Sequence, residues 1–306
     1  MLPVTEKLSA NTPIDALSAF DACAVLIDGQ RKAIAAVAAA GPQLTKAADI
    51  MAEALRAGRS LTYVAAGSSG LMALADCSEL AGTFGISQDL IHIFMAGGVP
   101  VDGCMPGDTE DSTAEVDAAL AHVGVCDVVI ALSASGTTPY ALGVARTAKI
   151  KGATVIGVAN NPDTELLNIA DIPICLETPS EIIAGSTRLG AGTAQKVALN
   201  TMSSMMGIAL GHVYKGQMVN VVADNIKLKK RAANIVAQIS DTSIATAQSA
   251  LGLADGNTKL AILIGSGIGK AQAEALLLQH AGHLGPCLQE RPRNHEKSSN
   301  MGERDD

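Results

Sequence analysis

Five short apolar runs, rich in β-branched residues, occupy the middle of the chain and alternate with Gly- or Ser-containing turns and helical stretches. Continuous apolar runs of this length are typical of strands buried on both faces. Their alternation with helices predicts right-handed βαβ connections and an α/β fold with a doubly wound, parallel, five-stranded sheet flanked by helices. The predicted strands are Leu61–Ala66, Ile91–Met95, Val128–Leu132, Thr154–Val158 and Ile172–Leu176.

Helical periodicity fills the chain on both sides of these runs. Apolar residues recur at three- and four-residue spacing from Ile14 to Arg59, and Ser186 to Tyr214 is predicted as one long, buried helix. Asp224–Gly252 is predicted to be helical. Lys259–Gln289 is ambiguous, because a strand-like run at its start is followed by a helical one.

Composition excludes several classes of protein. Hydrophobic residues make up 48% of the 306 residues and charged ones 17%, which excludes a mostly disordered chain. The apolar runs are shorter than the roughly 18 residues of a membrane-spanning helix, and no secretory signal is expected at the start. The net charge of -8 argues against nucleic acid or an anionic membrane as the main partner.

The cysteine content indicates the redox compartment, and the aromatic content limits the ways in which a ligand can be held. The six cysteines contain no CxxC pair, which favours reduced thiols and a cytoplasmic location. Trp is absent and aromatics are 2% of the chain, so platforms for stacking on bases or sugar faces are scarce. We therefore expect any bound sugar to be held by hydrogen bonds and charge.

Two hydroxyl-rich turns follow predicted strands at the point where each strand ends. The first turn is Ala66-Gly67-Ser68-Ser69-Gly70, and the second turn is Ser133-Ala134-Ser135-Gly136-Thr137-Thr138-Pro139. Parallel sheets bind ligands at the carboxyl ends of their strands. Helix-start N–H groups and hydroxyls suit anionic oxygens, and without GxxxxGK spacing they favour a sugar phosphate over a nucleoside triphosphate. An ordinary tight turn is the alternative interpretation of the first turn.

A third turn, Gly185-Ser186-Thr187-Arg188, precedes the predicted long helix. Ser186 or Thr187 is expected to serve as its N-cap. Arg188 is suited to a charge-assisted bond with an anion. Capping and ligand binding do not exclude each other here.

Two acidic residues are candidates for proton transfer. Glu79 lies one helix beyond the first turn, and Glu110 lies in the acidic loop after the second strand. A pair of carboxylates provides a general base and a general acid when a C–H beside a carbonyl is removed. Solvated surface carboxylates are the alternative.

These motifs together resemble a known family. The two hydroxyl-rich turns are similar to those of the sugar isomerase (SIS) domain. The fuller pattern resembles the N-acetylmuramic acid 6-phosphate etherase family and, more distantly, the glucokinase regulatory protein. The resemblance includes Asp76–Glu79 and Thr109–Ser112, is most specific over Gly185–Lys196, and covers about Asn11 to Leu288.

The resemblance implies a lyase that removes D-lactate from N-acetylmuramic acid 6-phosphate and leaves N-acetylglucosamine 6-phosphate. Glu79 matches the family's proton donor and Glu110 its second catalytic residue, so we expect Glu79 as acid and Glu110 as base. Neither a metal nor an organic cofactor is implied. A homodimer with the site near the subunit interface is implied, as is a small helical C-terminal part.

The same resemblance sets the expected substrate contacts and domains. Substrate contacts are expected from Ser68, Ser69, Gly70, Ser133, Ser135, Gly136, Thr137, Thr138, Ser186, Thr187, Arg188 and Lys196. The expected parts are an N-terminal helical segment (1–59) packed on a SIS phosphosugar-binding domain (60–222), a helical C-terminal part (223–289) and a disordered tail (290–306).

The chain departs from the family pattern at Leu80 and Ala81-Gly82, after Glu79, and at three positions where a basic side chain is missing. The family usually has Arg where this chain has Leu71 and Thr137, and Lys where it has Gly190. Each lost charge-assisted bond is worth about 1.5–3 kcal/mol, which predicts weaker binding of a phosphate plus a lactyl carboxylate. Two alternatives therefore stay open: a non-catalytic phosphosugar-binding regulator and a SIS-type phosphosugar isomerase.

Overall fold

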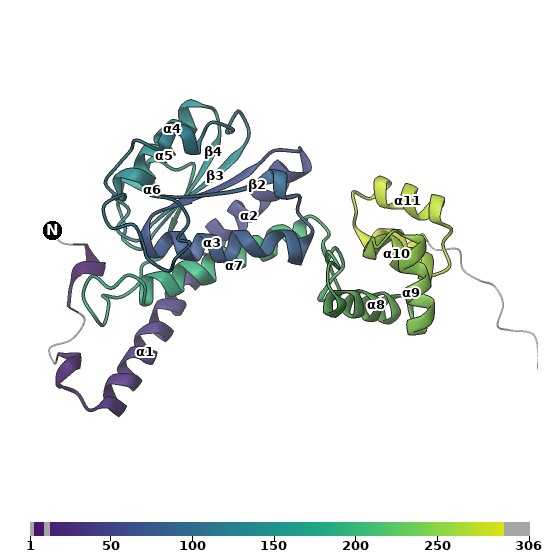
Figure 1. The fold of residues 1–306 in the computed structure, drawn as a ribbon, viewed down its shortest axis with the longest axis horizontal. Helices are drawn as coiled ribbons and strands as arrows, with labels where there is room; N and C mark the ends of the chain where they lie inside the picture. The colour runs from purple at the N-terminus through teal and green to yellow at the C-terminus, as the bar shows by residue number, and fades with distance from the viewer. Residues whose placement is uncertain (1–2, 9–12, 291–306) are drawn as a thin grey trace, which may run out of the picture. The chain divides into compact units, whose positions relative to one another are not determined.

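A computed structural model describes residues 3–8 and 13–290 of the chain (Figure 1). The chain divides into two compact units, unit 1 up to Leu210 and unit 2 from Gly211 onward. Apart from Glu290, the predicted disordered tail lies outside the described residues. No helix among the described residues combines the length and the apolarity that crossing a bilayer requires.

The centre of unit 1 is a five-stranded, wholly parallel sheet, which confirms the predicted fold class. The strands are β1 (Leu61–Ala65), β2 (Ile91–Met95), β3 (Val128–Ser133), β4 (Thr154–Ala159) and β5 (Ile172–Cys175), in the order β2-β1-β3-β4-β5. The chain moves outward from β1 to β2 and then returns to the other side of β1 with β3. The topological switch point, where open α/β sheets bind ligands, therefore lies between β1 and β3.

Helices cover both faces of this sheet (Figure 1). One layer contains α2 (Gly41–Arg56), α3 (Gly67–Phe84) and α7 (Gly190–Ala209), with α1 (Ala19–Val37) packed on α7. The other contains α4 (Val116–Ala119), α5 (Pro139–Ile150) and α6 (Glu165–Ile169). Alternate strand residues such as Val64, Val129 and Val155 form one core with Val144 and Leu166 of the second layer.

The short 3-10 helices of unit 1 are η1 (Val4–Glu6), η2 (Ile14–Ala16), η3 (Ala38–Ala40) and η4 (Gln88–Leu90).

The prediction of one helix from Ser186 to Tyr214 is wrong at both ends. Helix α7 begins only at Gly190, because the buried carboxylate of Glu181 accepts the N–H groups of Gly190 and Ala191 at 2.8 Å each and so sets the helix start. After α7, Val213–Tyr214 forms β6, which pairs with β7 (Gln217–Met218).

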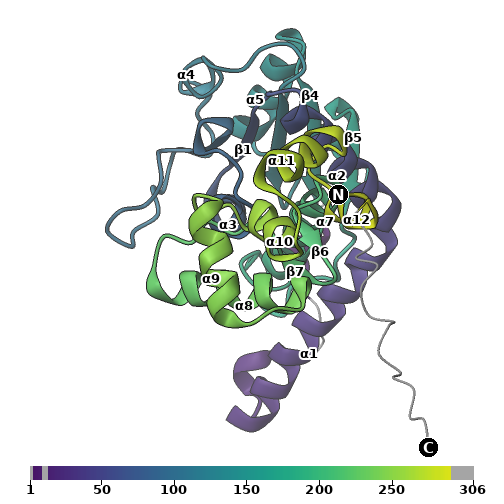
Figure 2. The same cartoon turned by 90° about the vertical axis from the view of Figure 1, so that its right-hand side faces the viewer.

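Unit 2 is helical around its short hairpin (Figure 2). Its helices are α8 (Ile226–Ser240), α9 (Ile244–Leu253), α10 (Thr258–Gly265), α11 (Lys270–Gln279) and α12 (Leu284–Gln289). The strand-like run Leu260–Ile264 is part of α10, where Asn257 caps the helix by accepting the Leu260 N–H at 3.0 Å. The helical alternative implied by the resemblance is therefore confirmed for the ambiguous segment.

Candidate active site

The first turn connects the buried strand β1 to helix α3. Gly67 has a φ of +53°, a conformation that glycine adopts without strain. Ala66 is the N-cap and supplies no side-chain hydrogen bond to the first helical N–H groups. Ser69 and Gly70 are buried and Ser68 is half-buried, with Met95 at the end of β2 packed against Gly70. The turn thus presents helix-start amides and a serine hydroxyl, which suits an anionic oxygen.

The second turn is held in shape by its own hydroxyl groups. Ser133 Oγ lies 2.7 Å from Thr138 Oγ1 and 3.2 Å from Ser135 Oγ, and it accepts the Gly136 N–H at 3.0 Å. Thr137 donates from its N–H and its hydroxyl to Ser135 Oγ, at 3.2 and 3.0 Å. The second turn is therefore a connected set of hydroxyls at the carboxyl end of β3, before α5.

Glycine is required at the centre of this turn. Gly136 has a φ of +73°, and any Cβ there would overlap the side chain of Thr164. The backbone of the turn therefore approaches the segment after β4 more closely than another residue would allow.

Glu110 joins the first turn to the second. Its carboxylate lies against Gly67, so closely that a Cβ on residue 67 would overlap Glu110 Oε1. Its backbone carbonyl accepts the N–H of Tyr140, in the first turn of α5, at 3.1 Å. The structure therefore places one predicted catalytic carboxylate at the switch point, between the two hydroxyl-rich turns.

Glu79 lies elsewhere in the same chain. It is exposed on α3, twelve residues after Gly67. At a rise of 1.5 Å per residue this is about 18 Å along the helix axis, more than a glutamate side chain spans. Within one copy of the chain, the carboxylates of Glu79 and Glu110 are therefore far apart.

The loop before α7 differs from its predicted role. Ser186 and Thr187 are half-buried loop residues and not N-caps, because the N-cap of α7 is Leu189 and its first N–H groups are taken by Glu181. The prediction of a cap here is wrong, and this helix start is occupied by a carboxylate of the protein. The two predicted cationic contacts in this part of the chain are Arg188 and Lys196. Both side chains are exposed and therefore accessible to an anion.

The structure shows what surrounds two of the positions where the family has a basic residue, Gly190 and Thr137. A Cβ on Gly190 would lie 3.1 Å from Glu181 Oε2 and 3.3 Å from Ala33 Cβ, so a side chain there requires one of them to move. Thr137 is exposed and bonded to Ser135. Gly190 therefore has little room for a side chain, whereas Thr137 is bonded into the hydroxyl set of the second turn and has no such restriction.

Three buried polar side chains to which sequence reasoning assigned no role hold the elements around the candidate site together, although one of them, Asp76, belongs to a quoted motif. Asp76 on α3 accepts hydrogen bonds from Tyr63 of β1 at 3.0 Å and from Asn200 and Ser203 of α7 at 2.7 and 2.9 Å. Burial, followed by the charge of Asp76, raises the pKa of Tyr63 well above its usual value.

The other two groups are the side chains of Asn160 and Asn161, directly after β4. They are 1% and 4% exposed, so they must bond within the protein. Two amide side chains following a buried strand, on the same edge as the hydroxyl-rich turns, were the available signal.

Two thiols near these elements are poor nucleophiles. Burial, then the charge of Asp76, raises the pKa of Cys77 to about 12. Burial, then Glu177, raises the pKa of Cys175 to about 11. Since the thiolate is the reactive form, neither cysteine is suited to nucleophilic catalysis at neutral pH.

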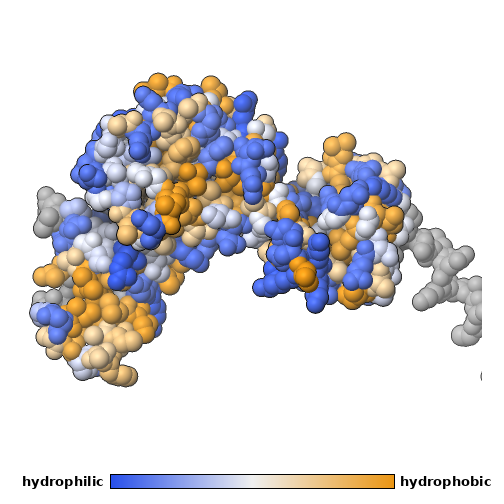
Figure 3. All heavy atoms as spheres, viewed as in Figure 1, coloured by the Kyte–Doolittle hydropathy of each residue, from blue (hydrophilic) through white to orange (hydrophobic). Residues whose placement is uncertain are grey.

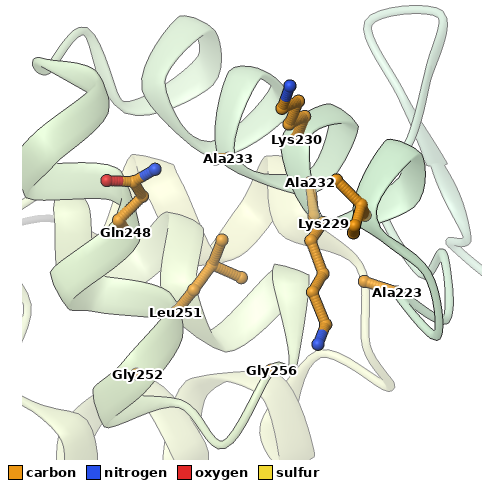
Figure 4. Close-up of a pocket in the computed structure, with 10 residues that line it drawn as sticks. Ala223, Lys229, Lys230, Ala232, Ala233, Gln248, Leu251, Gly252 and Gly256 are labelled. Carbon is orange, nitrogen blue, oxygen red and sulfur yellow. The ribbon is translucent and has the colours of Figure 1, made fainter.

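A large hollow lies on unit 2 (Figure 4). Its volume is about 480 Å³ and its lining is mostly aliphatic, with Leu251 in the middle and Lys229 and Lys230 extending in opposite directions. It contains none of the predicted site residues, so size alone does not locate the candidate site. Within residues 3–8 and 13–290, no three His, Cys, Asp or Glu side chains converge as metal ligands.

Comparison with known proteins finds a matching family and relatives that are similar over nearly the whole chain. The family described as "SIS domain" matches residues 29–160. The N-acetylmuramic acid 6-phosphate etherase of Deinococcus radiodurans is 41% identical over 280 residues, covering 90% of this chain and 92% of that protein. The protein of the same name from Nostoc punctiforme is 38% identical over 299 residues, covering 96% and 97%. Among solved structures, a phosphoheptose isomerase from Francisella tularensis is 20% identical, with a TM-score of 0.47, and covers 63% of this chain and 98% of that one.

Proposed function

This chain belongs to the N-acetylmuramic acid 6-phosphate etherase family, and from that membership we propose that it is a carbon–oxygen lyase acting on a sugar phosphate. Its substrate is N-acetylmuramic acid 6-phosphate or a closely related amino-sugar phosphate. The products are N-acetylglucosamine 6-phosphate and D-lactate. The six cysteines are all unpaired, which supports a cytoplasmic location.

The observation that carries this proposal is the position of Glu110 between the two hydroxyl-rich turns. Its carboxylate lies against Gly67 of the first turn, and its carbonyl is bonded at 3.1 Å to the start of the helix that follows the second turn. A phosphate held by the amides and hydroxyls of these turns keeps the sugar beside a carboxylate. That is the arrangement a base needs in order to remove a proton from a bound sugar.

The reaction needs one base and one acid. Opening of the sugar ring exposes an aldehyde at C1, which acidifies the proton on C2. Glu110 takes this proton, the electron pair forms the C2–C3 double bond, and the C3–O bond to lactate breaks. A protonated Glu79 donates its proton to the departing oxygen, which is a poor leaving group without it. Water then adds across the double bond.

The acid in this scheme comes from a second copy of the chain. Because Glu79 lies about 18 Å along α3 from the first turn, we assign this role to Glu79 of the partner subunit. A homodimer with the site near its interface then unites the two carboxylates. The exposure of Glu79 supports this arrangement.

Helix α1 offers a surface for such a dimer. Only Ala33 and Val37 of its nineteen residues are buried. Phe20, Ile27 and Ile34 are 83%, 63% and 44% exposed, and apolar residues gather on α1 in Figure 3. Their seven-residue spacing places them on one stripe, the pattern by which paired helices contact each other. We propose that this stripe packs against a second copy.

Release of D-lactate from N-acetylmuramic acid 6-phosphate tests the proposed function. We expect lactate and N-acetylglucosamine 6-phosphate in equal amounts from the parent protein, and almost none from Glu110→Gln. Binding of sugar phosphates without lactate release would instead indicate a regulator. Exchange of the C2 proton with solvent deuterium, without ether cleavage, would indicate an isomerase.

A further inference from the structure

The peptide between Ala134 and Ser135 has its orientation set from behind the second turn. The Ala134 carbonyl accepts two hydrogen bonds, from the Asn160 N–H at 3.0 Å and from Asn161 Nδ2 at 2.9 Å. A trans peptide is planar, so the Ser135 N–H points opposite to that carbonyl. Two donors on the carbonyl therefore direct the Ser135 N–H away from the asparagines.

This N–H forms no hydrogen bond with another group of the second turn. The Gly136 N–H is bonded to Ser133, and the Thr137 N–H is bonded to Ser135 Oγ. Backbone N–H groups in such turns form concave sites for anionic oxygens. The orientation of the Ala134–Ser135 peptide thus decides whether the Ser135 N–H is available as a backbone donor to a phosphate.

Asn161 is held in place by the start of the chain. Its Oδ1 accepts the Val4 N–H at 2.7 Å, and its Nδ2 also donates to Thr5 Oγ1 at 3.3 Å. These partners define which atom of the amide is the donor, since the Val4 N–H needs an acceptor and the Ala134 carbonyl needs a donor. Asn161 is 4% exposed and Thr5 is fully buried, so water does not replace these bonds.

The same N-terminal segment also holds the third turn. The Thr5 carbonyl accepts the Gly185 N–H at 3.0 Å, immediately before Ser186 and Thr187. Glu6 lies against Gly185, with its Oε2 at 2.9 Å from the position a Cβ would take. The segment Val4–Glu6 therefore bonds directly to the third turn and, through Asn161, to the second turn, which lies about fifty residues earlier in the sequence.

We propose that Asn161 is a positioning residue for the phosphate group, and that Val4–Glu6 holds its side chain in the required orientation. Asn161 turns the Ser135 N–H toward the bound phosphate without touching it. The inference rests on the proposed function in that the second turn is taken to bind the substrate phosphate. It adds that phosphate affinity depends on a segment far from the strand ends in sequence.

The decisive variant is Asn161→Asp, which is nearly isosteric. It keeps the acceptor for the Val4 N–H and places an oxygen, in place of the Nδ2 donor, against the Ala134 carbonyl. We expect affinity for inorganic phosphate and for N-acetylglucosamine 6-phosphate, measured by calorimetry, to fall at least about ten-fold. In the lactate assay KM should rise by a similar factor while kcat stays within about two-fold, because the reacting groups are untouched.

Three further variants separate positioning from general damage. Thr5→Val removes the hydroxyl acceptor at constant shape and should weaken phosphate binding by about two- to three-fold, whereas Thr5→Ser should restore it. Asn168→Asp introduces the same charge at an exposed residue of α6 and should behave as the parent does. Circular dichroism establishes that each variant is folded, and if Asn161→Asp is not, Thr5→Val decides.

Unchanged phosphate affinity in a folded Asn161→Asp protein would overturn the proposal, as would an equal loss of affinity in Asn168→Asp. Failure of the proposed function is a separate result. If the parent binds phosphosugars and releases no lactate, the lyase assignment fails while the calorimetric comparison still decides the role of Asn161.

Discussion

Glu110 and Gly67 occupy adjoining space so tightly that the carboxylate fills the position of the side chain that Gly67 lacks. One residue belongs to the turn after β1 and the other to the loop after β2. Because the Glu110 carbonyl is also bonded to the start of α5, the acidic loop is attached to both hydroxyl-rich turns. This contact is what brings a candidate base to the two hydroxyl-rich turns.

Replacing Gly67 by alanine should displace Glu110 and reduce turnover at least about ten-fold, because proton transfer depends on placement within a fraction of an ångström. Gly58→Ala is the matched control. Gly58 also has a positive φ, +67°, but has open space around its Cβ position. Both variants should lose about 1 kcal/mol of unfolding free energy from backbone strain, and only Gly67→Ala should lose activity. Equal lactate release by the two variants would contradict the assigned role of the contact.

Mixing two inactive variants tests whether the acid comes from the partner. Glu79→Gln and Glu110→Gln homodimers should each be nearly inactive. When they are unfolded together and refolded as a mixture, half of the dimers contain one copy of each. In each mixed dimer one site has both carboxylates, so activity should return to about a quarter of the parent level. No recovery in a mixture shown by mass spectrometry to contain mixed dimers would place both carboxylates in one chain.

Breaking the apolar stripe on α1 should dissociate the dimer. Phe20→Ser combined with Ile27→Ser removes two exposed apolar side chains of the stripe. Analytical ultracentrifugation should then detect a monomer, and lactate release should fall as the protein is diluted. Ile150→Ser removes another exposed apolar side chain, 86% exposed on α5, and should leave the sedimentation coefficient unchanged. A stripe variant that sediments as the parent does would exclude α1 from the interface.

Lys259 in unit 2 should make stability depend on pH. It is 6% exposed, and burial lowers its pKa from 10.5 to about 8. Below pH 8 both folded and unfolded states carry its charge, so the cost of burying that charge is present in full. Between pH 8 and 10.5 the unfolded state binds more protons, stability rises with pH, and above 10.5 the cost is gone.

Lys259→Met should therefore increase the unfolding free energy at pH 7 by on the order of 1–3 kcal/mol, and the gain should shrink at pH 10. Urea unfolding at both pH values measures it. Lys270→Met, at an exposed lysine paired with Asp255 at 3.2 Å, is the control and should change stability little at either pH. A gain that is the same at both pH values would exclude charge burial as its cause.

The sequence determined the α/β architecture because the signals for it are local. Each strand is a short β-branched run, such as Val128–Ser133, and each needs only burial on both faces to form. The hydroxyl-rich turns were visible for the same reason, since Ser and Gly directly after a strand mark its carboxyl end. The start of α7 was misplaced because Glu181, whose carboxylate accepts the first N–H groups of the helix, lies nine residues before Gly190 in sequence.

Tertiary structure alone decided which of the predicted residues meet. The sequence suggests that Glu79 and Glu110 act as a pair. In the fold, Glu110 contacts the first turn, whereas Glu79 is separated from that turn by the length of α3. The link from Thr5 through Asn161 to the second turn spans more than 120 residues and rests on buried hydrogen bonds. Such contacts depend on the order of strands in the sheet, a property of the folded chain that local patterns of residues do not contain.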